Sequence, residues 1–591
     1  MTSLKQKIIA WRLKFRKSRF FAFFNARCRT QEEMDKSLVY SLSSRKIPSR
    51  GQFKYLRRFL NPREYLVIKI CLLIILANAV YLGIVFFKKH LEFSPWPGGQ
   101  YVEGVVGYPK SINPLYSLSR DIDDDLSRLI YSRLFAYDTS GQLTPDLAAS
   151  QSLSQDGREY TIKLRDDARW HNDSQLDADD VIFTFNLIKD PAYRSPLASS
   201  FSGIEIAKID DYTVKFSLSE PYAPFLELLT FGIMPESIWN NIDSNNAALS
   251  DLNLKPVGSG PYRFKSLVRN RAGDLKEYRL VANEDYYGQK PYIKSVTFKF
   301  YVDYQQAIEA LNNGQVDGLS YLPLANRQDV LAKNSFSFYD LTRPQVMAVF
   351  FNGDKNKQLA DKNIRLALRS ALDRDSLAEL ASDGVYKRAD GPILPSSPAY
   401  NPAVSPAPYD PAGAASILSG KSISLTITVV DYGNNLAVAQ AIKDYWEKAG
   451  VKVELKSVSA EQAVDLVKSR DFEALLYGQV VGGDPDVYAF WHSSQSGASG
   501  LNLAGYRNEQ VDKLLAEARG SSNLEDRMAK YRQFQEIINT DVPAIFLYSP
   551  TYTYIHRKSI KGFSGDVLIK PADRFSDVAD WYVRTKKKLA W

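Results

Sequence analysis

The chain has 591 residues, too many for one compact core and enough for roughly three or four domain-sized units. Apolar residues make up 45% and charged residues 24%, which excludes a mostly disordered chain, a collagen-like fibre and a polytopic membrane protein. The two cysteines, Cys28 and Cys71, both lie near the N-terminus. The rest of the chain can therefore form neither an internal disulfide nor a thiolate metal site.

The charge is unevenly distributed along the chain. Residues 1–63 contain 17 lysines and arginines but only three acidic residues, a balance of +14. Because the whole chain carries +8, the remainder sums to −6. The basic charge is separate from the expected folded body, so we expect no nucleic-acid partner. Residues 4–24 mix aromatic and basic side chains, which fits either an interfacial segment on anionic lipid or a disordered basic tail.

An uncharged apolar run follows the basic segment. It extends from Ile70 to Phe87 and predicts one transmembrane helix over residues 64–88, because about 20 helical residues cross a bilayer core. The basic segment 1–63 indicates a cytoplasmic N-terminus, which leaves the body extracellular or periplasmic and the protein in the cell membrane as a single-pass protein. Neither a cleaved signal peptide nor a lipoprotein signal fits this region. Residues 89–99, rich in Pro and Gly, are expected to form a linker.

The body reads as mixed α/β. Asp156-Gly157 between two extended runs predicts a hairpin over residues 152–165, and Asp177 is expected to cap the helix that follows. Farther on, a strand at 422–430, a helix at 435–448 and a strand at 451–458 form a predicted βαβ unit, and hence part of a parallel sheet. The proline-rich stretch 392–411 reads as a surface loop.

Motifs for catalysis and for metal or phosphate binding are absent. The chain has no GxSxG or HExxH motif, and its histidines lack the spacing of a zinc site: His90, His171, His492 and His556. Gly258-Ser259-Gly260 reads as a structural turn. We therefore expect no catalytic residue, no metal and no cofactor, and a binding protein remains as the default.

Two acidic clusters have a spacing that resembles that of functional sites. Asp121, Asp123 and Asp125 have the spacing of a calcium loop, but the glycine and glutamate that such a loop needs are missing, so a solvated helix start is expected. Asp484 and Asp486 flank a proline, an arrangement that is typical of a turn and helix cap rather than of acid–base chemistry.

Nine motifs in order carry a resemblance to a known family. They lie at residues 143–185, 256–264, 283–293, 310–319, 363–377, 409–418, 483–491, 506–519 and 541–548. With them the chain resembles the family 5 extracellular solute-binding proteins, which serve peptide-type ABC importers. The resemblance implies an α/β, two-lobed type II periplasmic-binding-protein fold with an extra subdomain, here preceded by the transmembrane helix.

The resemblance also implies domain boundaries. Lobe one is expected at 100–345 together with 545–585, with the extra subdomain at 145–255 inside it, and lobe two is expected at 346–544. Two hinge segments are then expected, near Met347–Phe351 and near Ala544–Tyr548. By the same resemblance the protein would be a monomer.

The implied function is that of a membrane-anchored substrate-binding component. It would capture peptides or peptide-like solutes between closing lobes and deliver them to ABC permease subunits driven by cytoplasmic ATPases. Peptide-binding relatives commonly carry an aspartate, which pairs with the ligand's α-amine, at the position of Val481, so either Asp484 substitutes here or the ligand lacks a free amine. Other solutes, such as an oligosaccharide or a metal chelate, and an anchored sensor or scaffold remain alternatives. The candidate ligand contacts are Tyr116, Asn352, Gln479, Val481, Gly482, Asp484, Tyr488 and Trp491.

Overall fold

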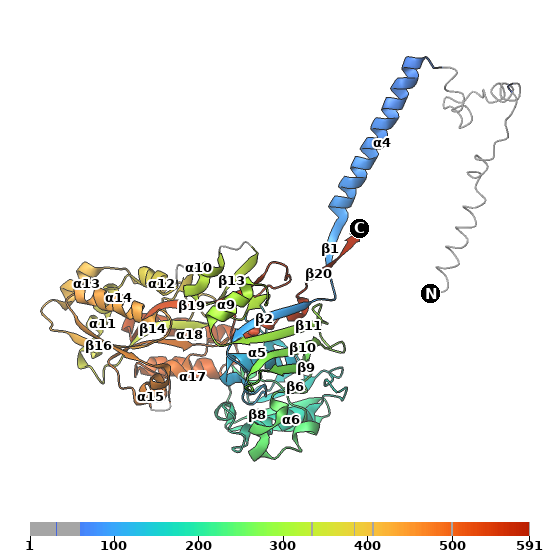
Figure 1. Ribbon diagram of the computed structural model, residues 1–591. Coiled ribbons are helices and arrows are strands. Elements are labelled where there is room, and N and C mark those ends of the chain that lie inside the picture. Colours follow the sequence, from blue (N-terminus) through green and yellow to red (C-terminus); the bar gives the residue numbers. More distant parts are fainter. Residues whose placement is uncertain are drawn as a thin grey trace. The chain divides into compact units, whose positions relative to one another are not determined.

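The computed structural model describes residue 31 and residues 60–331, 335–382, 385–404, 407–497 and 500–589 (Figure 1). The chain divides into two compact units, Met1–Ser94 with Lys587–Trp591, and Pro95–Lys586. Nearly all of the basic segment 1–63 lies outside the described residues. The two interpretations of residues 4–24 therefore stay open.

The first unit contains one long apolar helix. Helix α4 spans Pro62–His90 and includes the whole expected membrane segment. It is long and apolar enough to cross a membrane, and none of its side chains is buried. Strand β1 (Leu91–Trp96) follows it directly, within the segment expected to be a linker, and pairs with β20 (Arg584–Leu589).

The body, Pro95–Lys586, is built on one 12-stranded mixed sheet. Its strand order is β17-β16-β18-β14-β19-β12-β2-β11-β10-β9, with β13 and β15 also paired to β19. The strands are β2 (Gln100–Val106), β9 (Tyr262–Arg269), β10 (Leu275–Ala282), β11 (Ser295–Tyr301), β12 (Gly318–Leu319), β13 (Phe336–Thr342), β14 (Gln345–Phe351), β15 (Tyr386–Arg388), β16 (Ser424–Val430), β17 (Lys452–Val458), β18 (Ala474–Val480) and β19 (Ala544–Arg557).

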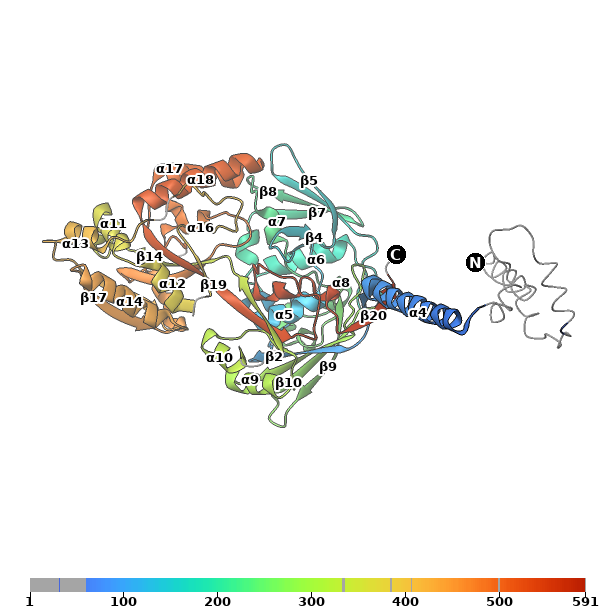
Figure 2. The same ribbon diagram turned by 90° about the horizontal axis from the view of Figure 1, so that it is seen from above.

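Strand β19 belongs to both lobes of the body. Its first part, Ala544–Tyr548, pairs with β14, and its second part, Thr551–Arg557, pairs with β13. We call the part built on β2 and β9–β13 lobe one, and the part built on β14–β18 lobe two. In Figure 2 the lobes lie side by side and β19 runs from one to the other. Fourteen residues of one strand thus join the two halves of the sheet.

Lobe one carries two smaller sheets and several helices. The expected hairpin is confirmed: β5 (Ala148–Leu153) pairs antiparallel with β6 (Glu159–Leu164) in a four-stranded sheet with β8 (Thr213–Leu218) and β7 (Ile204–Asp210). This sheet lies within the expected extra subdomain. Strands β3 (Phe135–Tyr137) and β4 (Leu143–Pro145) form the other sheet. The helices are α5 (Asp121–Ile130), α6 (Ala178–Lys189), α7 (Phe225–Leu228), α8 (Glu236–Trp239), α9 (Tyr304–Asn312) and α10 (Arg327–Leu331).

The predicted cap at Asp177 is confirmed as a capping box. The Asp177 carboxylate accepts a hydrogen bond from the backbone N–H of Asp179, and the Asp180 carboxylate accepts one from the backbone N–H of Asp177. Asp180 also accepts a hydrogen bond from the Trp170 indole at 3.0 Å. This capping box therefore marks the point at which the preceding loop ends and helix α6 begins.

Lobe two confirms the predicted βαβ unit, since β16 and β17 pair in parallel on either side of α14 (Asn435–Lys448). Along β14, Met347, Val349 and Phe351 enter one apolar core while the alternating residues enter another. At β14, which pairs antiparallel with both neighbours, the sheet is thus buried on both faces. The remaining helices are α11 (Lys362–Ser370), α12 (Arg374–Ser382), α13 (Pro411–Leu418), α15 (Ala460–Ser469), α16 (Tyr488–Trp491), α17 (Glu509–Gly520) and α18 (Leu524–Asp541).

The aspartates of α5 correct one sequence-based expectation. A helix does begin at Asp121, but Asp123 and Asp125 are each only 2% exposed, so the expected solvated start is wrong. The guanidinium of Arg574 lies 2.6 Å from both the Asp125 and the Glu103 carboxylates, and all three side chains are buried. The cluster belongs to the core of lobe one, because a buried carboxylate is tolerated only when a partner compensates its charge.

Candidate functional site

A cavity of about 690 Å³ lies between the two lobes. Lobe one contributes residues around β4, Glu227 of α7 and the segment near Val567, and lobe two contributes the loop after β18, the start of α18 and part of the proline-rich stretch. The volume is within the range of small-molecule and short-peptide sites. Its lining combines apolar side chains with a few polar groups, among them Ile393, Leu394, Val487, Leu524, Met528, Gln142, Ser396 and Ser397.

A glycine turn brings lobe two against lobe one. After β18 the backbone N–H of Val481 donates to the carbonyl of Pro344 at 2.7 Å, and Gly482 then turns with a φ of +77°. A Cβ added at Gly483 would lie 2.7 Å from Cε1 of Tyr137 and 2.9 Å from Oε1 of Glu227. Only glycine leaves room for these two lobe-one side chains against the lobe-two backbone.

Two carboxylates, one from each lobe, meet beside this turn. Burial and the negative charge of Asp484 raise the pKa of Glu227 to about 7, although hydrogen bonds from Tyr137 and from the Asp484 backbone oppose the shift. Burial also raises the pKa of Asp484, and the guanidinium of Arg527 opposes that shift. Nη2 of Arg527 lies 2.7 and 2.9 Å from the two Asp484 oxygens. The site thus holds two carboxylates and one guanidinium, a net negative charge when both are ionised.

A second contact between the lobes lies next to the first. Nε and Nη2 of Arg519 donate to one oxygen of Asp486, at 2.9 and 2.7 Å. The same guanidinium covers the ring of Tyr488 at 3.9 Å and that of Tyr222, from lobe one, at 5.4 Å. The backbone N–H of Ala223 donates to the carbonyl of Arg519 at 2.9 Å. The expected turn is present, because the Asp484 carboxylate accepts a hydrogen bond from the Asp486 N–H at 2.9 Å and the Asp486 carboxylate accepts one from the Tyr488 N–H at 3.1 Å. Each carboxylate also binds an arginine at the lobe interface.

The structure brings three of the sequence-predicted contacts together at the cavity: Val481, Gly482 and Asp484. Gln479 lies nearby on β18 but is buried, and its amide donates to the carbonyl of Leu501 at 3.3 Å. The three residues at the cavity come from one short loop, so their proximity follows from the sequence spacing alone.

The other four candidates lie outside the residues that line the cavity. Tyr488 stacks on His492 and Arg519. Trp491 is 1% exposed and packs in the lobe-two core. Asn352 follows β14 at the end opposite the glycine turn, where its amide donates to the carbonyl of Arg470. Tyr116 is half-buried against the core of lobe one.

The structure also reveals cavity residues that sequence reasoning missed. Glu227 and Arg527 lie in ordinary helical sequence, and nothing local marks them as facing another lobe. The stretch Pro392–Pro398 does carry a signal, its prolines, but it reads from sequence as a surface loop; its residues line the cavity instead. Val567 and Ile569 also line the cavity, because the chain returns to lobe one along β19 after completing lobe two.

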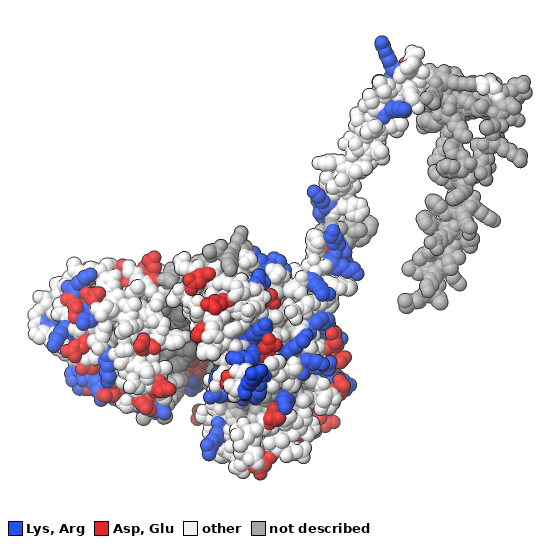
Figure 3. All heavy atoms as spheres, viewed as in Figure 1, with Lys and Arg blue, Asp and Glu red and all other residues white. Residues whose placement is uncertain are grey.

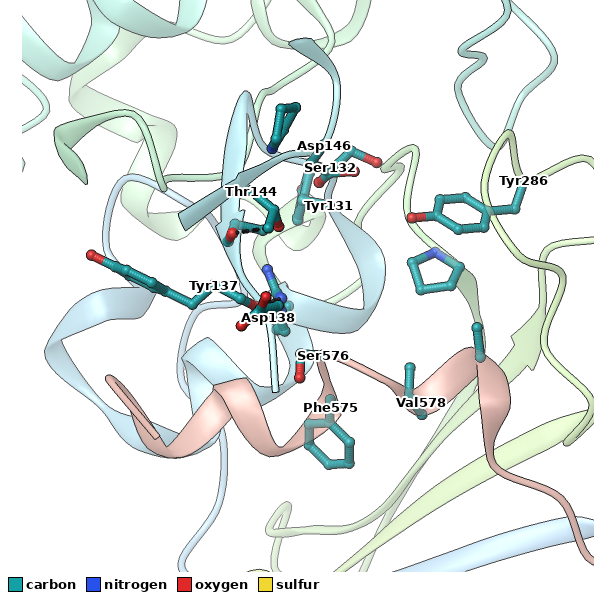
Figure 4. Close-up of a pocket in the computed structure, with 15 residues that line it drawn as sticks. Tyr131, Ser132, Tyr137, Asp138, Thr144, Asp146, Tyr286, Phe575, Ser576 and Val578 are labelled. Carbon is teal, nitrogen blue, oxygen red and sulfur yellow. Dashed lines mark hydrogen bonds between the residues drawn. The ribbon is translucent and has the colours of Figure 1, made fainter. Parts of the chain in front are cut away.

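A second, smaller pocket of about 210 Å³ lies within lobe one (Figure 4). It is lined by residues around α5, β3 and the segment 575–579. The hydroxyls of Tyr131 and Ser576 lie here without a hydrogen-bond partner among the described residues, and the volume holds several waters. Tyr137 lies between this pocket and the main cavity, with its ring directed away from the pocket centre.

Among the described residues no group of three or more His, Cys, Asp or Glu side chains is arranged to hold a metal ion. His171 is half-buried and His556 is buried, and burial lowers the pKa of each to about 4, so both are neutral near pH 7. His171 is engaged with the glycine turn at Gly258 and Gly260, and these glycines pack directly on the backbone of Ile130. Their role is therefore structural, as expected from the sequence.

Comparison with known proteins identifies relatives across the body. A family model described as bacterial extracellular solute-binding proteins, family 5 Middle, matches residues 142–500. Oligopeptide-binding protein AppA of Bacillus subtilis (strain 168) is 28% identical over 502 residues, which cover 79% of this chain and 89% of AppA. The dipeptide-binding protein of Escherichia coli (strain K12) is 26% identical over 496 residues, which cover 78% of this chain and 92% of that protein.

Solved structures match as well. AppA from Bacillus subtilis in complex with a nonapeptide superposes with a TM-score of 0.65 at 27% identity, covering 83% of this chain and all of AppA. NikZ from Campylobacter jejuni in complex with Ni(L-His) gives a TM-score of 0.67 at 27% identity, covering 82% of this chain and 99% of NikZ. The residues matched by the family model include both sides of the contact between the lobes, Glu227 and the glycine turn at 482–483.

Proposed function

The chain belongs to the bacterial extracellular solute-binding proteins of family 5, and from this we propose that it captures peptides or peptide-like solutes between its lobes for an ABC importer. The observation that carries the proposal is the 690 Å³ cavity, which both lobes line. A ligand held there touches both lobes at once, so its binding free energy favours the closed arrangement over an open one.

The chemistry of the lining supports a peptide-like ligand. The glycine turn offers backbone groups, and main-chain donors and acceptors are common to all peptides. Apolar side chains such as Leu394 and Met528 offer contacts for ligand side chains. Val481 cannot pair with an α-amine, but Glu227 and Asp484 lie beside it. We propose that Glu227 balances a positive charge on the ligand, since Arg527 already engages Asp484.

Closure would take place at the two chain crossings between the lobes. The sheet partner of β19 changes between Tyr548 and Thr551, and the chain passes from β13 to β14 between Thr342 and Gln345. These short segments are our proposed hinge. They lie within a few residues of the segments expected from the sequence, near Met347–Phe351 and Ala544–Tyr548. A few residues at the ends of elements are enough to absorb such a rotation.

Anchoring, topology and partners form the rest of the proposal. Helix α4 would span the cell membrane with residues 1–63 in the cytoplasm and the body outside. The body would dock as a monomer on permease subunits driven by cytoplasmic ATPases, without catalytic activity of its own. Protease treatment of intact cells should release the body and leave the N-terminal segment protected, and a protected body would contradict this topology.

Native mass spectrometry of the full chain in mild detergent tests the ligand. A series of co-purified peptide masses, released on unfolding, would support the proposal. An empty protein whose melting temperature no peptide mixture raises would contradict it and favour a sensor or scaffold, since a ligand at 100 times its dissociation constant adds about 2.7 kcal/mol.

A metal chelate is a second candidate ligand. It is favoured by the apolar side chain of Val481, which lines the cavity where the family resemblance leads us to expect an acid. It is also favoured by the similarity to NikZ, which is described in complex with Ni(L-His). In the same mass spectrometry experiment a single discrete mass that contains a metal would favour the chelate over peptides.

A further inference from the structure

The structure brings two distant parts of the sequence together at the end of helix α4. Strand β1 begins at Leu91, directly after the helix ends at His90, so no loop separates them. Strand β20, almost 500 residues later in the sequence, pairs with β1 as a two-stranded sheet apart from the other sheets. The part of β20 in the first unit therefore lies near the end of the apolar helix.

Basic side chains gather at this point. Lys88 and Lys89 close α4, and Lys587 and Lys588 lie on β20; all four are exposed. We call these four lysines the basic collar. Figure 3 shows blue side chains at the C-terminal end of α4. Between Lys88 and Ser94 the acidic residue is Glu92, so the collar keeps a net positive charge. The Lys587 ammonium lies 6.0 Å from the ring of Phe93, which is 59% exposed.

The length of the apolar run determines where the basic collar lies relative to the hydrocarbon core of the membrane. The 18 residues Ile70–Phe87 extend about 27 Å as a helix, close to the ~30 Å of a bilayer core. Lys88 then lies at the border of the core, and β1 continues through the headgroup layer at about 3.3 Å per residue. Phe93, six residues beyond the core, is thus still near the membrane surface, where aromatic side chains are favoured.

From this placement we propose that the basic collar binds the anionic headgroups of the outer leaflet of the membrane that α4 spans. The proposal rests on the anchoring proposed above. A lone two-stranded sheet is marginally stable in water, so β1 and β20 need further support, which a lipid surface supplies. Each basic side chain near an anionic surface strengthens binding roughly fivefold, and salt weakens it. The exposed Phe93 and the continuity with α4 favour lipid over free phosphate.

Hydrogen exchange on the full chain in nanodiscs tests the proposal. Backbone amides of residues 584–589 should exchange on the order of tenfold more slowly in discs with 30% phosphatidylglycerol than in pure phosphatidylcholine discs, and 0.5 M NaCl should abolish the difference. The double variant Lys587→Gln/Lys588→Gln should abolish it too. The control Lys456→Gln/Lys468→Gln removes the same charge from exposed positions in lobe two and should leave it intact.

Three results would overturn the proposal. Equal exchange in the two kinds of disc would refute the collar while leaving the anchor intact. Equal protection by millimolar inorganic phosphate in phosphatidylcholine discs would assign the site to a free anion instead of lipid. Failure of the chain to enter discs at all would refute the anchor itself, and with it the collar.

Discussion

The contact of Glu227 with lobe two should make closure of the ligand-free protein depend on pH. The groups that face this carboxyl are the Tyr137 hydroxyl, the Asp484 carboxylate and the Arg527 guanidinium. Burial in the contact raises the pKa of Glu227 from its ordinary value of 4.5 to about 7. The contact therefore has its full stability below about pH 4.5, where Glu227 is protonated in every state, and loses stability as the pH rises through 7.

The size of the effect follows from the shift. A rise of about 2.5 units corresponds to about 3 kcal/mol, or a change on the order of 10² in the ratio of open to closed molecules between pH 4.5 and pH 8. Glu227→Gln keeps the shape of the side chain but cannot ionise. That variant should stay closed over the whole range. A cationic group of the ligand beside Glu227 would offset the loss, so ligand should reduce the pH dependence.

Fluorescence energy transfer between the lobes measures this directly. Dyes on Lys276→Cys in lobe one and Lys468→Cys in lobe two, in a chain with Cys28→Ser and Cys71→Ser, report the closed fraction. We expect the closed fraction to fall between about pH 4.5 and pH 7 with Glu227 present, and no transition in Glu227→Gln.

The matched control is Glu309→Gln, because Glu309 is an exposed carboxylate on α9 of lobe one. It should keep the transition. The same pH profile in the Glu227→Gln variant and in the parent chain would refute the reasoning, since the transition would then belong to another group.

Three further outcomes are expected. Gly483→Ala forces a methyl group against the lobe-one side chains, so overpacking of about 1–3 kcal/mol should lower ligand affinity roughly 5- to 150-fold in calorimetric titration. Gly497→Ala, whose added methyl group meets open space, should leave the affinity unchanged, and equal affinities of the two variants would contradict the contact. Asp177→Ala removes the cap of α6 and should lower the free energy of unfolding in urea by about 1 kcal/mol. An unchanged urea midpoint would show that the cap does not contribute to stability. Arg574→Met leaves two carboxylates buried without their cation and should destabilise the fold by about 3–5 kcal/mol. A melting temperature at pH 7 within 1 °C of the parent would contradict this.

The sequence by itself determined the features whose signals are local. An uncharged run of 18 residues is enough to define helix α4, and the Asp177 capping box lies within four consecutive residues. The hairpin at Gly157 and the βαβ unit follow from turn residues and periodicity. Gly482 lies beside two other sequence-predicted ligand contacts, Val481 and Asp484, because all three belong to one short loop.

Only the tertiary structure decided which charged side chains are buried and which partners they meet. Asp125 looked solvated from its neighbours in sequence, yet Arg574, 449 residues away, makes its burial possible. Glu227 looked like an ordinary helix residue until the fold placed it against Gly483 of the other lobe. Burial, and with it the energy of a charge, depends on chain segments that local sequence patterns do not connect.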